Sequence, residues 1–460
     1  MSDQLTAALN YAKESRDQTL EDLKKLVSIP SISTDPKAEN DIKRAAEWIE
    51  NRLRNLGMHN VQTFPTPGHP VVYGEWLGAG AGKPTVLIYG HYDVQPPEPL
   101  ELWESPPFEP TQRENNLYGR GASDMKGQLI VGLNSVEAVK KTGQLPINVK
   151  FIIEGEEEVG SPNLGQFITT HKELLWCDYA INLDGGIIGP ETPTITYGLR
   201  GLAYFEIRLS GPDHDLHSGV YGGVVHNPAQ VLCELIAGMH DEHGRVTLPG
   251  YYDSVQPVDE QERAELARLP MDENFYLKQT GAPMLYGEAG YSPVEHSGVR
   301  PTLEVNGLLS GFTGEGAKTV LPARAMAKIS MRLVPDQDPN MVHQQLVKYL
   351  DAHAPTTVQW EVDLISGSPA SITSRDFVGV NALSKALEDT WGKRPVFRRE
   401  GGSVPVVGQM QEILGIDSVL TGFGLPDDNL HAPNEKIHLP TFYRGIETMI
   451  RYLNILGETD

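Results

Sequence analysis

The sequence predicts an α/β fold, a sheet covered by helices on both faces, with a second α+β domain inserted into it. Short, nearly continuous apolar runs are separated by helical segments, which is typical of buried strands in such a sheet. From about residue 202 the apolar residues instead occupy every second position, which indicates strands with one solvent-exposed face. The chain has 460 residues, and single cores stop growing at about 250–300 residues, so two domains are expected.

The first domain is expected to contain helices and short apolar strands. Apolar residues between 42 and 56 recur at three- and four-residue spacing, which predicts a helix that ends at Gly57. A second helix is predicted over residues 125–141. Runs with β-branched members predict strands at 85–89, 149–153, 179–183 and 418–423.

Residues 191–369 are predicted to form the inserted domain, and residues 1–190 and 370–460 together form the discontinuous first domain. Within the insert, residues 249–297 are rich in Asp, Glu, Gly and Pro and are expected to be a long excursion. The rest of the inserted domain is expected to contain strands at 203–209 and 325–333 and helices around 228–239 and 340–350.

The composition narrows the class of protein. With 38 Lys and Arg against 61 Asp and Glu, the net charge of −23 argues against a nucleic-acid partner and against an anionic membrane surface. No window approaches the roughly 20 apolar residues of a membrane span, and residues 1–5 do not read as a secretory signal. The two cysteines, Cys177 and Cys233, exclude a disulfide framework. A cytoplasmic location is therefore expected.

Potential metal ligands follow each of the four predicted strands of the first domain. In open α/β sheets, ligands bind beyond the carboxyl ends of the strands, so these side chains are expected to converge. A further candidate, Asp124, begins the helix predicted after it. The residues at the strand ends are His91, the glutamates 156–158, Asp184 and His431.

Two histidines and three carboxylates suit a pair of divalent ions, with one carboxylate bridging them. Asp93 lies two residues after His91, so it should point the same way and orient the imidazole. Each residue also has an ordinary structural interpretation. Asp124 could be a helix N-cap, Asp184 a turn residue before Gly185, and the histidines simple hydrogen-bonded side chains.

Four segments together resemble the metallopeptidase family of carnosine dipeptidases, aminoacylases and glutamate carboxypeptidases. The resemblance extends from about residue 15 to the C-terminus, and it implies a mixed sheet of the zinc-peptidase type with an inserted lid and dimerisation domain. The segments are His91-Tyr92-Asp93, Gly121-Ala122-Ser123-Asp124-Met125-Lys126-Gly127, Glu157-Glu158-Val159-Gly160-Ser161 and His431-Ala432-Pro433-Asn434-Glu435.

The resemblance also implies roles for these residues. Asp124 would bridge two Zn²⁺ ions per subunit, although Mn²⁺ and Co²⁺ suit such ligands as well. His91 and Asp184 would complete one metal site, and Glu158 and His431 the other. Glu157 would be the general base, because Val159-Gly160-Ser161 fixes the frame of the three glutamates.

Residues of the inserted domain resemble the dipeptidase branch of the family. His217, in Asp215-Leu216-His217-Ser218-Gly219, would reach the active site of a partner subunit and stabilise the oxyanion, so a homodimer through the insert is implied. Thr319 and Arg332 would hold the substrate, with Arg332 on its terminal carboxylate. Gly402 and Ser403 resemble the substrate loop of the family. In ordinary structural terms, His217 could be a turn residue, Arg332 a surface arginine and Ser403 an N-cap.

The function implied is hydrolysis of the peptide bond of dipeptides or very short peptides. One alternative is an N-acyl amino acid deacylase of the acetylornithine or succinyl-diaminopimelate type, which the sequence around His217 disfavours. Another is a non-catalytic homologue, which the intact ligand set disfavours. The excursion at 249–297 could trim the substrate channel or widen the contact between subunits.

Overall fold

The computed structural model describes residues 3–402 and 404–458, and its contacts divide the chain into two compact units. Unit 1 comprises residues 1–197, 373–397 and 405–460, and unit 2 comprises residues 198–372 and 398–404. The short segment 398–404 is expected in the first domain, but it belongs to unit 2. None of the described helices is long and apolar enough to cross a membrane.

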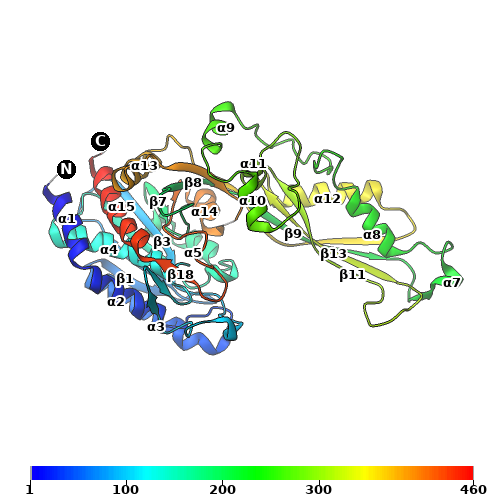
Figure 1. Ribbon diagram of the computed structural model, residues 1–460, viewed down its shortest axis with the longest axis horizontal. Coiled ribbons are helices and arrows are strands. Elements are labelled where there is room, and N and C mark those ends of the chain that lie inside the picture. The colour runs from blue at the N-terminus through cyan, green and yellow to red at the C-terminus, as the bar shows by residue number, and fades with distance from the viewer. Residues whose placement is uncertain (1–2, 403, 459–460) are drawn as a thin grey trace. The chain divides into compact units, whose positions relative to one another are not determined.

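Unit 1 is built on a mixed sheet in which the predicted strands run parallel (Figure 1). Its order is β1-β2-β6-β3-β7-β17-β8, where β6, β3, β7 and β17 are parallel and β1, β2 and β8 are antiparallel to their neighbours. Every residue of β3 (Thr85–His91) and β6 (Asn148–Glu154) is buried, as expected of strands covered on both faces. The α/β prediction is therefore confirmed.

The strand register brings the carboxyl ends of the parallel strands to one edge of the sheet. His91 at the end of β3 lies opposite Glu154 at the end of β6. Tyr89 and Leu420 lie opposite Asn182 at the end of β7. The other strands of this sheet are β1 (His59–Phe64), β2 (Val71–Trp76), β7 (Tyr179–Asn182), β8 (Thr194–Leu199) and β17 (Ser418–Leu420). Two further strands, β15 (Ser371–Ile372) and β16 (Val396–Glu400), pair with β8.

Helices cover this sheet, with α1, α4 and α15 on one side and α5 and α14 on the other (Figure 1). The helix predicted at 42–56 is α3 (Glu39–Asn55), which buries Ile42, Ala45 and Ile49 and ends before Gly57, whose φ is +67°. The remaining helices of unit 1 are α1 (Asp3–Glu14), α2 (Arg16–Val27), α4 (Lys126–Thr142), α5 (Leu164–Thr170), α6 (Lys172–Leu175), α13 (Val378–Trp391), α14 (Pro405–Gln409) and α15 (Leu439–Glu458). A small sheet joins β4 (Thr111–Arg113), β5 (Asn116–Tyr118) and β18 (Lys436–His438).

Unit 2 contains an antiparallel sheet of order β11-β13-β9-β14. Buried and half-buried residues alternate along β9 (Gly201–Ser210) and β13 (Arg324–Leu333), as the sequence predicts. One face packs on α8 (Pro228–Ala237) and α12 (Pro339–His353), and the core between them includes Phe205, Ile329 and Leu346. The edge strands are β11 (Thr302–Ser310) and β14 (Gln359–Ser368).

The excursion at 249–297 contains three helices that the sequence pattern does not predict. They are short and mostly polar, so apolar periodicity is weak; each begins at a side-chain N-cap, Asp259, Asp272 or Ser292. The helices are α9 (Glu260–Leu266), α10 (Glu273–Thr280) and α11 (Pro293–Gly298). The short elements β10 (Leu216–His217), α7 (Ser218–Tyr221), β12 (Val320–Leu321) and β15 (Ser371–Ile372) complete unit 2.

Candidate active site

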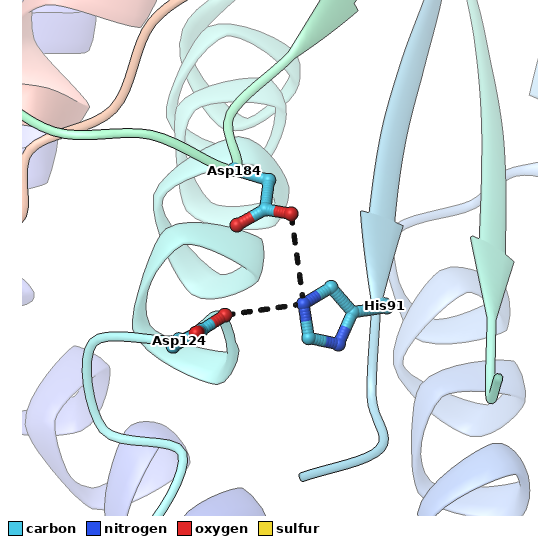
Figure 2. A group of neighbouring side chains, drawn as sticks. All are labelled: His91, Asp124 and Asp184. Atoms are coloured by element: carbon cyan, nitrogen blue, oxygen red, sulfur yellow. Dashed lines mark ion pairs between the residues drawn. The ribbon is translucent and has the colours of Figure 1, made fainter. Parts of the chain in front are cut away.

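His91 is fully buried at the end of β3 and faces two carboxylates of other segments (Figure 2). Its Nε2 lies 3.3 Å from Oδ1 of Asp124 and 3.8 Å from Oδ2 of Asp184. Its Nδ1 lies 3.1 Å from the carbonyl oxygen of Asp93 and 3.3 Å from Oδ1 of the same residue. One ring nitrogen is thus held by Asp93, and the other is directed at Asp124 and Asp184.

Asp93 connects the end of β3 to the turn that follows β6. Its Oδ1 accepts a hydrogen bond from the backbone N–H of Glu157 at 3.2 Å, and its Oδ2 accepts one from Glu158 at 3.1 Å. The same buried carboxylate therefore orients His91 and fixes the backbone of two of the three glutamates. Such a carboxylate beside a histidine sets the ring orientation and the tautomer of a metal ligand.

Asp124 is presented by a tight loop that Glu435 holds from within. The Glu435 carboxylate accepts hydrogen bonds from the backbone N–H groups of Gly121, Ser123 and Asp124 at 2.9–3.1 Å. Arg120 donates to the same carboxylate at 2.7 Å, and both side chains are buried. Gly121 has a φ of +83°, which favours glycine in this loop. The position of Asp124 is therefore set by a carboxylate 311 residues away in the chain.

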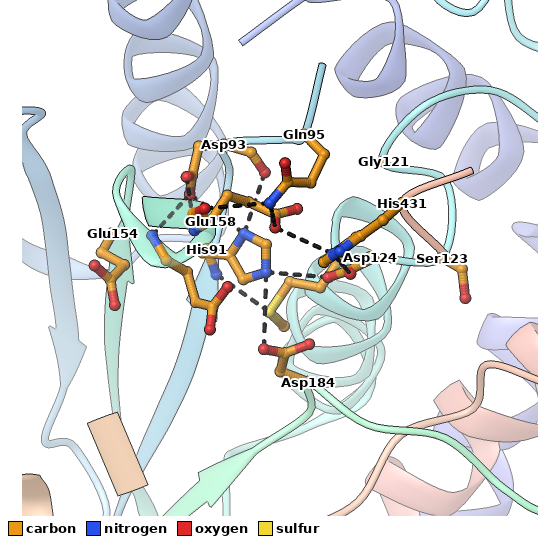
Figure 3. A network of polar contacts seen from close by, with 12 residues as sticks. His91, Asp93, Gln95, Gly121, Ser123, Asp124, Glu154, Glu158, Asp184 and His431 are labelled. Carbon is orange, nitrogen blue, oxygen red and sulfur yellow. Dashed lines mark hydrogen bonds and ion pairs between the residues drawn. The ribbon is translucent and has the colours of Figure 1, made fainter. Parts of the chain in front are cut away.

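A second cluster lies on the other side of Asp124 (Figure 3). The Nε2 of His431 is 3.0 Å from Oδ2 of Asp124 and 3.2 Å from Oε2 of Glu158. Gln95 donates to Oε2 of Glu158 at 2.9 Å and holds that side chain in place. Hydrogen bonds with Asp124 and Glu158 raise the pKa of His431 to about 10.

Asp124 therefore belongs to two groups of potential metal ligands. In each group the ligand atoms lie within 4.8 Å of one another: His91, Asp124 and Asp184 in the first, and Asp124, Glu158 and His431 in the second. Within the described residues, the buried Nε2 of His91 forms no hydrogen bond, as expected of an atom that serves as a ligand. Burial and the neighbouring Asp124 hold the pKa of Asp184 well above its usual range. A divalent cation would relieve this crowding of carboxylates, so the residues fit a pair of metal ions.

The three consecutive glutamates have different environments. Glu156 is buried, and its carboxylate accepts hydrogen bonds from Asn163 at 2.9 and 3.1 Å. Glu158 faces His431. The carboxylate of Glu157 is desolvated, and this burial is the main cause that raises its pKa to about 7. A carboxylate of that pKa is suited to accept and return a proton near neutral pH.

Comparison with known proteins is consistent with this arrangement. Residues 87–455 match the model of peptidase family M20/M25/M40. The chain belongs to the M20 peptidase family. The predicted family resemblance is therefore confirmed. The chain is 31% identical over 468 residues to the Cys-Gly metallodipeptidase DUG1 of Candida albicans, covering 97% of this chain and 96% of the relative. It is 31% identical over 461 residues to the Beta-Ala-His dipeptidase of Homo sapiens, covering 96% and 90%.

Solved M20 structures show the same fold. Human carnosine dipeptidase 1 superposes with a TM-score of 0.81 at 30% identity, covering 100% of both chains. The M20 family metallo-carboxypeptidase Sso-CP2 from Sulfolobus solfataricus superposes with a TM-score of 0.84 at 33% identity, covering 96% of this chain and 99% of that one. The mixed sheet with an inserted α+β domain is thus the architecture of M20 peptidases.

The other predicted site residues of this M20 chain lie in unit 2. His217 is exposed at the start of α7, where its Nδ1 accepts a hydrogen bond from Gly219 at 3.0 Å. Thr319 is also exposed, and its carbonyl accepts from the N–H of Ser218 at 3.0 Å. Arg332 is half-buried near the end of β13. Gly402 has open space around it, and Ser403 lies outside the described residues.

His217 and Arg332 lie at opposite ends of the sheet of unit 2. His217 pairs with Val320, just before β13 begins at Arg324, whereas Arg332 is eight residues further along that strand. At about 3.3 Å per residue, this stretch alone spans roughly 26 Å. Figure 1 shows α7 at one end of this sheet and α10 and α11 at the other. The two residues of one chain therefore cannot contact the same small molecule.

Several residues that organise the M20 site are absent from the sequence-based prediction. Glu435, Arg120 and Gln95 hold the potential metal ligands in place, as described above. Asp428 accepts hydrogen bonds from the Ser123 hydroxyl at 2.9 Å and from Lys436 at 3.0 Å. Glu435 could have been found, because it closes the segment that begins at His431. The other contacts join distant parts of the chain and leave no local pattern.

Proposed function

We propose that this chain is a metal-dependent dipeptidase that hydrolyses the peptide bond of dipeptides or very short peptides. The observation that supports this most strongly is the single carboxylate of Asp124, shared by two ligand groups, beside a desolvated Glu157. Shared carboxylates of this kind occur in hydrolases with two metal ions. Relatives named as dipeptidases that align over nearly the whole chain support the same reaction.

The proposed metal ligands are His91, Asp124, Glu158, Asp184 and His431, with Asp124 shared. We infer that the ions are Zn²⁺, although Mn²⁺ and Co²⁺ suit the same nitrogen and oxygen ligands. Bound there, the pair of ions would polarise the peptide carbonyl and make an attacking water more acidic. Asp93 orients His91 and, through Glu157 and Glu158, the turn beside it.

Glu157 is the proposed general base. Its carboxylate takes a proton from the water as the water oxygen attacks the peptide carbonyl carbon, and it returns that proton to the leaving nitrogen as the C–N bond breaks. The products are two amino acids when the substrate is a dipeptide. A pKa of about 7, raised by burial, suits both the uptake and the return of the proton.

Substrate contacts are proposed for residues of unit 2. Arg332 binds the terminal carboxylate, since a guanidinium and a carboxylate form paired hydrogen bonds. Thr319, Gly402 and Ser403 line the substrate site, and His217 donates to the oxyanion that forms on the peptide carbonyl. Because His217 and Arg332 of one chain lie far apart, and Thr319 is hydrogen-bonded to Ser218 beside His217, a complete site requires both His217 and Thr319 from a second subunit.

We therefore propose a homodimer that forms through the inserted unit. The edge strand β11 supports this, because it exposes Leu308 and Leu309, which are 57% and 58% accessible. An exposed apolar edge strand invites pairing with another strand. The proposed role of unit 2, residues 198–372 and 398–404, is thus that of a lid and dimerisation domain.

Complementation tests the sharing of residues between subunits. His217→Ala and Arg332→Ala are each expected to be nearly inactive alone. In a refolded equimolar mixture, half of the dimers are mixed, and each has one intact site, so about a quarter of the wild-type activity should return. No recovery, in a mixture shown by mass to contain mixed dimers, would exclude a shared site.

We also propose a cytoplasmic location. Cys177 and Cys233 are both free thiols, which suits a reducing compartment. Fractionation of the source cells is the test, and recovery of the enzyme outside the cytosolic fraction would contradict this proposal.

A substrate panel tests the proposed reaction. Unblocked dipeptides are assayed beside N-acetyl and N-succinyl amino acids, with added Zn²⁺ or Mn²⁺ and with a chelator. We expect release of free amino acids from the dipeptides and loss of this activity with chelator. Activity confined to the acylated compounds would instead identify a deacylase and contradict the dipeptidase proposal.

A further inference from the structure

A cavity of about 670 Å³ lies within unit 2, and Arg332 forms part of its wall. This volume is in the range of sites that hold a small ligand. Thr302 and Glu304 of β11 and Ser330 and Arg332 of β13 share the face of the sheet that forms one wall. The excursion beyond residue 249 forms the opposite wall, partly through α10 and α11. The cavity therefore begins where the substrate carboxylate is proposed to bind.

The excursion forms a well-defined wall. Arg300 and Glu288 are both buried and form a pair of hydrogen bonds at 2.7 and 2.9 Å. The Arg300 guanidinium also lies over the ring of Tyr291, 4.4 Å from its centre. On the same wall, Tyr276 is hydrogen-bonded to Ser297 at 3.1 Å. These contacts hold the wall in shape without a ligand.

Arg200 brings a second guanidinium to the cavity beside Arg332. It donates to the carbonyl oxygens of His296 at 3.2 Å and Gly401 at 3.3 Å, so it ties the 401–402 loop to the same site. Burial, followed by the nearby charge of Arg332, lowers the pKa of Arg200 to about 10. Two adjacent cations at one end of the cavity favour an anionic group there.

The charges that line the cavity are balanced before a substrate enters. Three arginines, at 200, 300 and 332, face three glutamates, at 273, 288 and 304. A substrate carboxylate on Arg332 would leave the lining with one net negative charge. Glu304 is exposed toward the cavity, and within the described part of the chain its carboxylate forms no hydrogen bond or ion pair. A cationic group of the substrate would complement the negative charge of Glu304.

From these observations we propose that this cavity binds the side chain of the C-terminal residue of the substrate and that Glu304 selects a cationic side chain, such as that of lysine or arginine. This inference rests on the proposed dipeptidase function and on the role of Arg332 in it. In this arrangement the carboxylate of the substrate binds the guanidinium end of the cavity, and its side chain extends along β11 toward Glu304. Glu304 is thus a residue that determines specificity and takes no part in the chemical step.

The test compares three dipeptides that differ only in the C-terminal side chain: Ala-Lys, Ala-norleucine and Ala-Glu. Norleucine has the four-carbon chain of lysine without its ammonium group, so the ratio of kcat/KM for Ala-Lys over Ala-norleucine reports the contribution of that group. We expect a ratio of roughly fivefold, the upper range for a solvent-accessible ion pair. Higher salt should reduce this ratio by screening.

Two variants locate the source of the preference. Glu304→Gln should bring the ratio close to one with little change for Ala-norleucine, and Glu304→Lys should favour Ala-Glu over Ala-Lys. The matched control is Glu361→Gln, which removes the same charge from β14 of the same sheet, outside the cavity. It should keep the wild-type ratio.

The possible failures are distinguishable. If the enzyme cleaves all three dipeptides but Glu304→Gln leaves their ratios as in the wild type, the role of Glu304 is wrong and the dipeptidase proposal stands. If Glu361→Gln lowers the ratio as much as Glu304→Gln does, the preference comes from the overall charge of the sheet, and the inference is also wrong. If no dipeptide in a broad panel is cleaved, the proposed function fails together with the inference.

Discussion

Three consecutive glutamates follow β6, and the contacts of their side chains separate them into a structural residue, a proposed base and a proposed metal ligand. Glu156 is bound to Asn163, and Glu158 lies beside His431. Glu157 lies between them in the sequence, with its backbone held by Asp93. Among the described residues, the carboxylate of Glu157 is the one of the three that forms no hydrogen bond or ion pair, and it is thus the proposed proton carrier.

Replacement of Glu157 by Gln should lower kcat by roughly 10²–10⁴-fold, the range for a lost general base. Metal content, measured by mass spectrometry, should stay at the wild-type level, because Glu157 is outside both ligand groups. Glu156→Gln is the matched control, since its side chain faces Asn163, and it should remain active. An active Glu157→Gln variant would show that another residue carries the proton.

The two thiols should differ in reactivity. Cys177 is buried, and burial raises the pKa of its thiol to about 12, so at pH 8 almost none of it is thiolate. Cys233 is exposed. Iodoacetamide at pH 8 should therefore add one group to the folded protein, at Cys233, and two groups after denaturation. Intact-mass and peptide mass spectrometry measure this, and labelling of Cys177 in the folded protein would contradict its burial.

At the scale of elements, the loop that presents Asp124 depends on β18 and the segment before it. Glu435 precedes β18 and accepts hydrogen bonds from the Asp124 loop, and Asp428 accepts one from Ser123. The loop and the start of α4 are therefore positioned by residues close to the C-terminal helix, although they lie early in the chain.

Glu435→Gln should destabilise unit 1 by about 3–5 kcal/mol, because the amide NH2 group would face buried N–H donors and the buried charge of Arg120 would lose its carboxylate partner. Urea unfolding followed by circular dichroism measures the change. Glu104→Gln is the control, since Glu104 forms an exposed ion pair with Arg113, and it should cost less than about 1 kcal/mol. Equal effects of the two substitutions would show that Glu435 does not support the loop.

The edge strand β11 makes the proposed dimer testable. The double substitution Leu308→Lys and Leu309→Lys places charge on this edge and should yield monomers with little activity, because His217 is then not supplied by a partner. Sedimentation velocity measures the mass. Ile365→Lys, on the opposite edge strand β14, changes an equally exposed residue, 53% accessible, and should leave the dimer intact. A fully active monomer would contradict the proposed sharing of His217.

The sequence predicts the buried parallel strands well, because both of their faces are covered and the middle of each strand is mostly apolar. The strands at residues 203–209 and 325–333 are also predicted, since alternation is a local signal. The mostly polar strand β1 and the helices of the excursion are missed, because short polar segments depend on capping and on distant contacts. The strand β2 is also missed, although five of its six residues are buried. For the site, the residue types and their positions after the predicted strands are enough to predict the proposed metal ligands. The roles of Glu435 and Arg200 become visible only in three dimensions.

At the scale of the whole molecule, metal binding and folding are expected to be linked. The proposed site brings together Asp124, Glu158 and Asp184, whose like charges repel without a cation. A metal that binds only the folded chain adds about 2.7 kcal/mol of stability when its free concentration is about 100 times Kd.

A chelator should therefore lower the melting temperature of the wild-type protein, and added Zn²⁺ or Mn²⁺ should restore it. Scanning calorimetry measures the shift. Asp124→Asn, which weakens the shared ligand, should show a much smaller response to chelator. An unchanged melting temperature of a metal-loaded wild-type sample after chelation and dialysis would show that the site does not couple metal binding to folding.

The assignment of residues 398–404 to unit 2 has a consequence for dissecting this protein. Arg399 reaches Glu262 at 2.5 Å and Gly401 accepts from Arg200, so this short segment is joined to the body of unit 2 although it is separated from it in sequence by α13. Segments of the two units therefore alternate along the sequence, and the chain passes from one unit to the other four times. Removing residues 198–372 would leave a stranded seven-residue remnant, and expressing them alone would omit the 401–402 loop. To produce unit 2 by itself, its two segments have to be expressed as two fragments or joined by a new linker. For the same reason, unit 2 cannot be replaced by the corresponding unit of another M20 peptidase through a single continuous segment.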